Sequence, residues 1–232
     1  ASTMFIDFVS NPWMPLVGHT AFLLVTALVV MIGIKDGIEK FSKVMMPMLF
    51  FIVIAIAVYS LTLPGAGKGV EYLFKPDFSK IDAEVCAAAL GQAFFSLSIG
   101  CGTIMTYGSY VNKKENIAGL SAETAITDTS FAIIAGLAIM PAVFAFGISP
   151  SEGPGLVFVT LPYIFAQIPF GAFLAILFFF MLFIAAITSS ISQLEVIVSY
   201  LKEEFNMSRK IAILLSIAVI VVFGVLCSLS QG

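Results

Sequence analysis

The stretch GQAFFSLSIGCGTIMTYGSY, residues 91–110, decides the fold of this chain. It belongs to an apolar run that is long enough to cross a bilayer, which takes about 20 residues, yet its centre reads SLSIGCG. Closely spaced glycines and hydroxyl side chains interrupt a helix instead of continuing it. Irregular backbone at membrane depth is tolerated only where protein buries it or where it lines a cavity. The stretch therefore predicts a broken transmembrane helix, with the break near 96–102.

The composition indicates an integral membrane protein. Hydrophobic residues make up 60% of the chain and charged residues 11%, and the mean hydropathy is +1.08. A soluble domain has about half apolar and about a quarter charged residues. The net charge of −3 is spread over the chain and offers no basic surface for nucleic acid. We find no nucleophile paired with a base, no nucleotide loop and no metal-ligand cluster, so we expect no enzyme.

The hydropathy pattern predicts an all-α membrane protein, a polytopic helical bundle that forms a single transmembrane domain over residues 1–232. The residues before the first span mix Asp, Asn, Pro and the only Trp, which suits an interfacial stretch. An external, lid-like loop is expected at 149–164. The six predicted spans lie near 17–34, 44–63, 83–110, 118–147, 165–201 and 209–229.

The basic residues predict the orientation, because Lys and Arg beside membrane spans are retained in the cytoplasm. Only three of the 11 basic residues, the lysines at positions 68, 75 and 80, lie away from the loops that follow the first, third and fifth spans. The other eight basic residues lie after those spans: Lys35, Lys40, Lys43, Lys113, Lys114, Lys202, Arg209 and Lys210. These loops are thus expected inside and both termini outside a cell (inner or plasma) membrane. The chain does not begin with Met, so we expect a piece of a longer protein.

Polar residues of three spans are expected at one depth. Asp128 lies about ten residues from the cytoplasmic end of its span, or roughly 15 Å deep. The break at 96–102 reaches a similar level, and Thr188 and Ser189 lie a little beyond it. A lone hydroxyl in a membrane helix is explained well enough by helix packing or by a bond back to its own backbone. An acid near the bilayer centre is costly, and Asp128 therefore points to an ion path, a substrate site or a proton relay.

The chemistry of a broken helix favours transport. The break frees backbone carbonyls and amides at membrane depth. Carbonyl and hydroxyl oxygens suit a sodium ion, and the positive amino end of the outgoing half-helix suits a carboxylate. A site of this kind fits transport better than catalysis.

Several motifs resemble the neurotransmitter:sodium symporter family, particularly its prokaryotic amino-acid transporters, among them the bacterial leucine transporter. They are the stretch 91–110, GIKDGIEKFSKVMMP (33–47), GPGLVFVTLP (153–162), and ITSSIS (187–192) followed by SRK (208–210). The resemblance covers almost the whole chain. It implies that the six spans are the fourth to ninth of about twelve, in an inverted-repeat fold whose other broken helix lies outside this chain.

The resemblance also implies roles for individual residues, which fall into three groups. The substrate-binding positions are Phe95, Ser98, Cys101, Ser189 and Gln193, with Phe95 as an aromatic gate. The sodium-binding positions are Ser96 and Asp128 in a first site and Ala185, Thr188 and Ser189 in a second. The cytoplasmic gate comprises Tyr110, Glu195 and Glu203.

The implied function is sodium-coupled symport of an amino acid. Asp128 supplies a built-in negative charge where chloride-dependent relatives keep an anion, so we expect chloride independence. Cys101 and Gln193 imply a roomier, partly polar pocket for a larger or aromatic amino acid. Sodium is the coupling ion, no cofactor is expected, and the partners are the substrate, sodium and the lipid bilayer. A homo-oligomer is compatible with the sequence. A proton-coupled transporter using Asp128 as the proton carrier and a non-transporting fragment remain open.

Overall fold

A computed structural model describes residues 2–11, 13–147, 157–158, 161–166 and 169–229. The described residues are helical or in connections, with no strand among them. They form two compact units, one of residues 1–52 and 151–232 and the other of residues 53–150. The boundary between the two units falls within a helix, between residues 52 and 53. The expected lid-like loop at 149–164 lies mostly outside the described residues, and the single domain stays a prediction.

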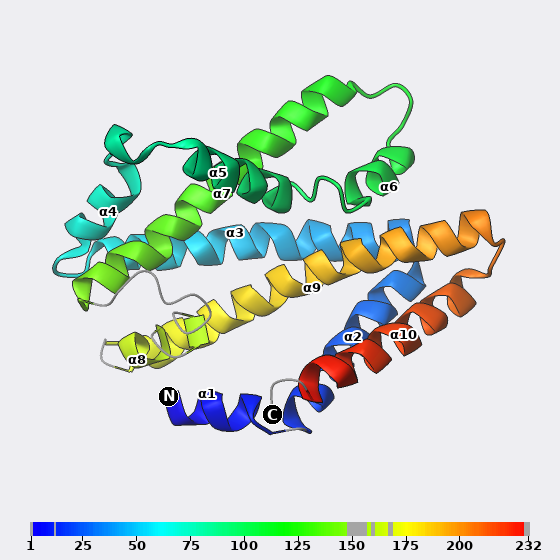
Figure 1. Cartoon of the computed structure of the whole chain (residues 1–232), viewed down its shortest axis with the longest axis horizontal. Helices are drawn as coiled ribbons and strands as arrows, with labels where there is room; N and C mark the ends of the chain where they lie inside the picture. The colour runs from blue at the N-terminus through cyan, green and yellow to red at the C-terminus, as the bar shows by residue number, and fades with distance from the viewer. Residues whose placement is uncertain (1, 12, 148–156, 159–160, 167–168, 230–232) are drawn as a thin grey trace. The chain divides into compact units, whose positions relative to one another are not determined.

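The first unit is built on three long helices that pack against one another: α2 (Met14–Ile32), α9 (Gly171–Glu204) and α10 (Arg209–Leu229). Figure 1 shows α2 and α10 side by side. The short helix α8 (Leu161–Phe165) packs on α9, and α1 (Ser2–Val9) precedes α2. A π-helix, η1 (Ile34–Glu39), leads into α3 (Lys40–Leu61), whose first part belongs to this unit.

Local sequence signals explain the ends of α2. The Asn11 side chain accepts hydrogen bonds from the amides of Trp13 (2.9 Å) and Met14 (3.0 Å), which satisfies donors left free at a helix start. Pro15 in the first turn has the backbone angle that a helix start needs. Gly33 ends the helix with φ 109°, a conformation that residues with a Cβ rarely adopt. The predicted span 17–34 therefore corresponds to α2, shifted by a few residues.

The predicted span 165–201 is not one helix. Its described residues belong to α8, which ends at Phe165, and to α9, which begins at Gly171 and continues to Glu204. Pro169 has no amide proton to continue a helix, and Phe170 takes a left-handed conformation with φ 59°. The apolar run Pro-Phe-Gly at 169–171 hides this break from a hydropathy pattern.

A buried ion pair joins the helices of the first unit. The Glu195 side chain is fully buried, and Arg209 donates two hydrogen bonds to its carboxylate, one of them 3.1 Å long. The Nε of Arg209 also donates to the Val30 carbonyl at 2.9 Å. Arg209 thus ties the start of α10 to the middle of α9 and the end of α2. Such fork-like pairing offsets the cost of burying two charges only when their hydrogen bonds are satisfied.

The second unit contains α4 (Ala66–Phe74), η2 (Phe78–Lys80), α5 (Ala83–Ser96), α6 (Thr103–Tyr110) and α7 (Ile117–Ala145). Asp82 caps α5 by accepting from the Val85 amide at 2.8 Å, and Asn116 caps α7 by accepting from the Gly119 amide at 3.2 Å. Asp and Asn are favoured at this position because their oxygens satisfy free amides. These caps account for the starts of the predicted spans 83–110 and 118–147.

Helix α4 lies against the second half of α7. A Cβ at Gly69 would lie 2.5 Å from the Pro141 Cα and 2.6 Å from the Met140 carbonyl. Only glycine permits this approach of two backbones. On the outer part of α4, Lys75 donates to Glu71 at 2.7 Å and lowers the pKa of that carboxyl below its ordinary value.

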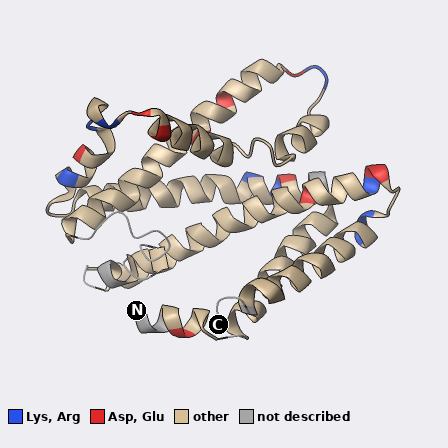
Figure 2. Ribbon diagram, viewed as in Figure 1, with Lys and Arg blue, Asp and Glu red and all other residues tan. Residues whose placement is uncertain are grey.

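Five of the described helices are long and apolar enough to cross a membrane: α2, α3, α7, α9 and α10. The chain is thus a multi-pass membrane protein. In Figure 2 the long helices are mostly without charge, and Lys, Arg, Asp and Glu gather near helix ends and in connections. The remaining predicted span, 83–110, consists of two half-helices that are each too short to cross alone.

The α4–α7 contact predicts that Gly69→Ala destabilises the protein. The new methyl group meets backbone atoms, which cannot move away as a flexible side chain can, and we expect a loss of about 1–3 kcal/mol. Thermal unfolding of the purified full-length protein measures it. Gly67→Ala on the same helix is the control, because nothing lies within 4 Å of its added Cβ. Equal unfolding temperatures for the two variants would contradict this packing.

The ion pair predicts that Glu195→Gln lowers the stability of the full-length protein by about 3 kcal/mol, because it leaves the partly buried Arg209 guanidinium without this counter-charge. Adding Arg209→Gln restores part of the loss. Glu71→Gln is the control, since its partner Lys75 is exposed and exposed pairs contribute little. If the two single variants unfold at the same temperature, the buried pair does not hold α9 and α10 together.

Candidate functional site

The backbone breaks between α5 and α6. Helix α5 ends at Ser96 and α6 begins at Thr103, and the break predicted near 96–102 falls between them. Ser98, Gly100 and Gly102 have φ of 54°, 91° and 81°. Glycine takes this left-handed conformation freely, whereas a serine there is uncommon and is kept where the surrounding structure imposes it. The break is therefore a built feature of the helix.

The break leaves polar backbone groups at the ends of both half-helices. The Ile99 amide turns back to the Phe94 carbonyl at 2.9 Å and closes the end of α5. The residue before α6 is Gly102, which provides no side-chain cap. Its first amides have no acceptor within their own helix, so its amino end carries partial positive charge.

Ser96 and Asp128 meet across the unit. The Ser96 hydroxyl donates to the Asp128 carboxylate at 2.7 Å, which joins the end of α5 to the middle of α7. Other hydroxyls of α7 bond to their own helix, as those of Thr124 and Thr129 do at 2.8 and 2.9 Å. Ser96 thus differs from the ordinary membrane serine that bonds to its own backbone.

A cavity of about 640 Å³ lies beside this contact. Ser96, Ser98 and Asp128 line it, together with residues of α6 and the first half of α7. A cavity of this size is typical of small-molecule sites. The structure therefore brings together three of the predicted site residues around one space.

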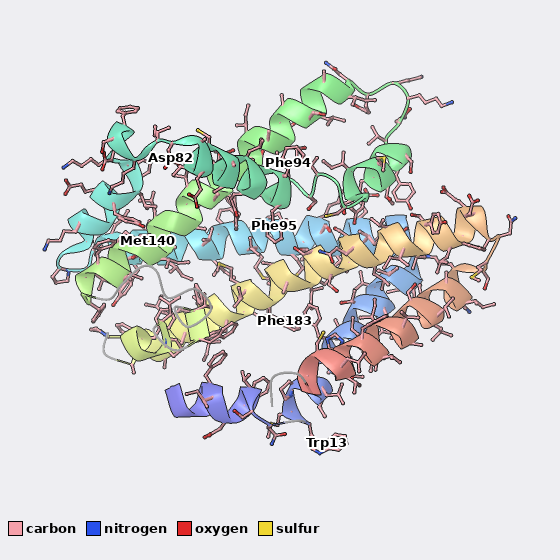
Figure 3. The ribbon with its side chains drawn as sticks, in the orientation of Figure 1. Trp13, Asp82, Phe94, Phe95, Met140 and Phe183 are labelled. Carbon is pink, nitrogen blue, oxygen red and sulfur yellow. The ribbon has the colours of Figure 1, made fainter. Side chains whose placement is uncertain are left out.

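The other predicted residues of this unit lie outside that lining. Phe95, labelled in Figure 3 at the end of α5, is 80% exposed. Cys101 is exposed with a free thiol. Tyr110 ends α6 and packs edge-on against Tyr107, with ring centroids 6.3 Å apart. Their predicted roles stay predictions.

In the first unit, the predicted second sodium site lies on one turn of α9. The Thr188 hydroxyl donates to the Ala185 carbonyl at 2.9 Å, so two of its predicted oxygen ligands are already adjacent. Ser189 and Gln193 are exposed and lie four residues apart, on one face of the helix. Glu203 is also exposed, in the last turn of α9.

Sequence reasoning used Arg209 only as one of the cytoplasmic basic residues that predict the orientation, and it missed the residue's pairing. The structure leaves this side chain 21% exposed and pairs it with Glu195, a predicted gate residue. A signal was available, because an acid within an apolar helix needs a nearby cation and α10 begins with one. Thr26, buried in α2, was also missed; its hydroxyl lies 3.1 Å from that of Ser190.

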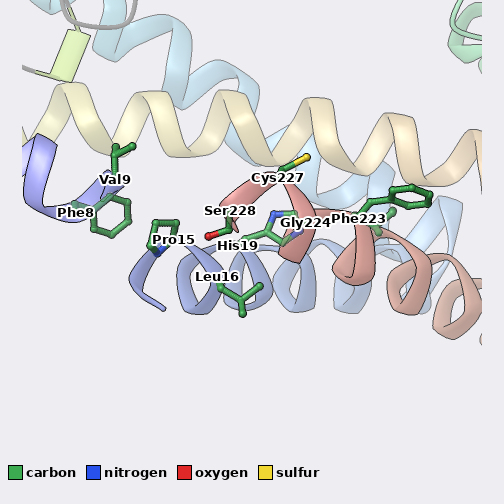
Figure 4. Close-up of a pocket in the computed structure, with 10 residues that line it drawn as sticks. Phe8, Val9, Pro15, Leu16, His19, Phe223, Gly224, Cys227 and Ser228 are labelled. Carbon is green, nitrogen blue, oxygen red and sulfur yellow. The ribbon is translucent and has the colours of Figure 1, made fainter. Parts of the chain in front are cut away.

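A second cavity, of about 540 Å³, lies in the first unit between α1, α2 and the end of α10 (Figure 4). It is lined mostly by apolar side chains and by His19, whose Nε2 is buried without a hydrogen-bond partner among the described residues. A Cβ at Gly224 would lie 2.5 Å from that nitrogen. His19 thus fills the space left by a glycine of α10. Within the described ranges, no group of His, Cys, Asp and Glu could hold a metal ion.

The chain is similar to a known protein family and to several known proteins. The model of the sodium:neurotransmitter symporter family matches residues 8–232. An uncharacterised sodium-dependent transporter of Haemophilus influenzae is 43% identical over 88% of this chain and 44% of its own length. The uncharacterised sodium-dependent transporter YhdH of Bacillus subtilis is 41% identical over 99% of this chain and 51% of its own.

A crystal structure of MhsT in complex with L-phenylalanine superimposes with a TM-score of 0.90 at 48% identity. The match covers 99% of this chain and 52% of MhsT. The chain thus spans about half the length of the relatives that it matches. The fold class expected from the sequence is confirmed, and the chain belongs to the sodium:neurotransmitter symporter family, whose members are transporters and not enzymes.

Proposed function

We propose that the protein containing this chain couples the inward movement of sodium to uptake of an amino acid across the plasma membrane, without a requirement for chloride. The observation that carries the proposal is the hydrogen bond from Ser96 to Asp128 beside the broken helix. Family membership and the names of the sodium-dependent relatives support it.

The first sodium ion would bind beside that hydrogen bond. The Ser96 hydroxyl and the Asp128 carboxylate provide oxygen ligands 2.7 Å apart, and hard cations such as sodium prefer oxygen. The carboxylate also neutralises the ion in a medium where an unpaired charge is costly. This built-in charge is the reason to expect chloride independence.

The second sodium ion would bind on α9. The Ala185 carbonyl and the Thr188 hydroxyl share one hydrogen bond. An ion bound by both oxygens would take the place of that bond, with the hydroxyl proton turned to another acceptor. Ser189 follows in the chain and is the third ligand that the family resemblance implies. We expect both ions to move inward, and each charge that crosses releases about 2.3 kcal/mol per 100 mV of membrane potential.

The substrate would bind at the break. The amino end of α6 suits its carboxylate, and Ser98 lines the cavity beside it. The family resemblance implies four further substrate-binding residues: Phe95, Cys101, Ser189 and Gln193. A small residue at Cys101 favours a larger or aromatic amino acid, and MhsT, a structural relative, was solved with L-phenylalanine.

The cytoplasmic gate would use Tyr110 at the end of α6 and Glu203 in the last turn of α9. Glu203 is exposed, so it is accessible to a cation of the rest of the protein. Glu195 is already held by Arg209. We propose that this pair anchors the helix that carries the gate while Glu203 makes and breaks contacts.

The proposal predicts that uptake of labelled L-phenylalanine by cells or vesicles containing the full-length protein needs sodium. Replacing sodium by choline should abolish uptake, and replacing chloride by gluconate should leave it unchanged. In competition assays, aromatic and other large amino acids should inhibit more than glycine or alanine. Uptake that persists in choline but follows a proton gradient would instead make Asp128 a proton carrier, and preference for small amino acids would contradict the pocket proposed here.

Asp128→Asn is predicted to raise the sodium concentration for half-maximal uptake by about tenfold in chloride-free buffer, because the ion loses a charged ligand (~1.4 kcal/mol). Added chloride should restore part of the activity. Glu123→Gln removes an exposed acid of the same helix and serves as the control. If Asp128→Asn takes up substrate without chloride as the unmodified protein does, Asp128 is not a sodium ligand.

A further inference from the structure

Helix α2 contacts α9 through a buried polar pair beside the predicted second sodium site. Thr26 is fully buried, and its hydroxyl oxygen lies 3.1 Å from the hydroxyl oxygen of Ser190. The Thr26 hydroxyl also bonds to the Phe22 carbonyl of its own helix at 3.0 Å. A hydroxyl has one proton and two lone pairs. When Thr26 gives its proton to Phe22, Ser190 is the donor to Thr26.

This contact holds α9 from the side away from Ala185 and Thr188. With 3.6 residues per turn, the directions of Ser190 and Thr188 around the helix are about 160° apart. Ala185 and Thr188, three residues apart, share the other side. A bond at Ser190 therefore resists rotation of the turn that presents the Ala185 carbonyl and the Thr188 hydroxyl.

The described hydrogen bonds of two neighbouring hydroxyls lie within α9. Thr188 donates to the Ala185 carbonyl, and Ser192 donates to the Thr188 carbonyl at 3.0 Å. In α2, Thr20 donates to the Leu16 carbonyl of its own helix at 2.8 Å. The Thr26–Ser190 contact is thus a distinct connection between the two helices.

We propose that Thr26 is a positioning residue for sodium binding: it sets the rotation of α9 so that the Ala185 and Thr188 oxygens face one ion. This inference rests on the proposed function. Ion sites need their ligands held within about 0.5 Å and about 10–20° by a supporting shell. A slight rotation of α9 would separate the two oxygens from the remaining ligands and weaken sodium binding, while the substrate contacts would still form once sodium is bound.

The test is Thr26→Val in the full-length protein, which keeps the shape of the side chain and removes its hydroxyl. We expect the sodium concentration for half-maximal uptake to rise about two- to tenfold, the equivalent of one net hydrogen bond. The KM for the amino acid at saturating sodium should change by less than about twofold. Sodium-induced thermal stabilisation of the purified protein should shift to higher sodium by the same factor, which keeps the test valid when uptake is low.

Matched variants separate positioning from a general loss of structure. Thr26→Ser keeps the hydroxyl and should retain the original sodium dependence. Thr20→Val removes a hydroxyl that bonds only within α2 among the described contacts, and should leave sodium dependence unchanged. The double variant Thr26→Val, Ser190→Ala should raise the sodium concentration for half-maximal uptake no more than the more affected single variant does. Both substitutions remove the same hydrogen bond.

Each outcome decides between the two proposals. Unmodified protein that works equally in sodium and choline overturns the proposed function. Sodium-dependent uptake with an unchanged sodium requirement in Thr26→Val overturns only the positioning role. A sodium requirement that rises equally in Thr20→Val and Thr26→Val also overturns the positioning role. Loss of either hydroxyl of α2 would then have the same effect on sodium dependence.

Discussion

The bilayer interior contains no water, so every backbone amide and carbonyl in a membrane span needs a partner within the protein. Helical hydrogen bonds meet most of that requirement in the long helices of this chain. The segment between α5 and α6 leaves the helical path and takes left-handed conformations at Ser98, Gly100 and Gly102. The amides at 97–99 bond back to α5, whereas the first amides of α6 have no acceptor within their own helix and suit a substrate group. The cavity, the contact with Asp128 and the proposed coupling all depend on this interruption.

Polar contacts within the first unit have a different purpose, because they hold apolar helices in one arrangement. Apolar side chains alone define the rotation of a membrane helix weakly, since lipid tails are as apolar as leucine. Arg209 connects Glu195 and the Val30 carbonyl, and Thr26 connects to Ser190. Both contacts act on α9, the helix with the predicted second sodium site. Two of the buried polar residues thus help to orient α9.

Much of this architecture was predictable because it follows from local pattern. Apolar length predicted the membrane helices, and the glycines predicted the break. The interruption before Gly171 was missed, since Pro169 lies within an apolar run and a hydropathy pattern does not register backbone angles. The position of Arg209 was missed as well. Its charge lies next to a loop in the sequence, yet the turn after α9 folds it back onto Glu195. The set of substrate-binding residues that the family resemblance implies stays a prediction.

By itself the sequence determined the class of protein, the approximate helices and the chemical types present at membrane depth, because these depend on composition and on spacing along one helix. The tertiary structure decided which hydroxyls meet partners on other helices. Ser96 and Thr129 look alike in sequence, but one donates to Asp128 and the other to its own backbone. The physical reason is that a hydroxyl bonds to its own helix by default, and a bond to another helix requires the two helices to pack at one depth and rotation.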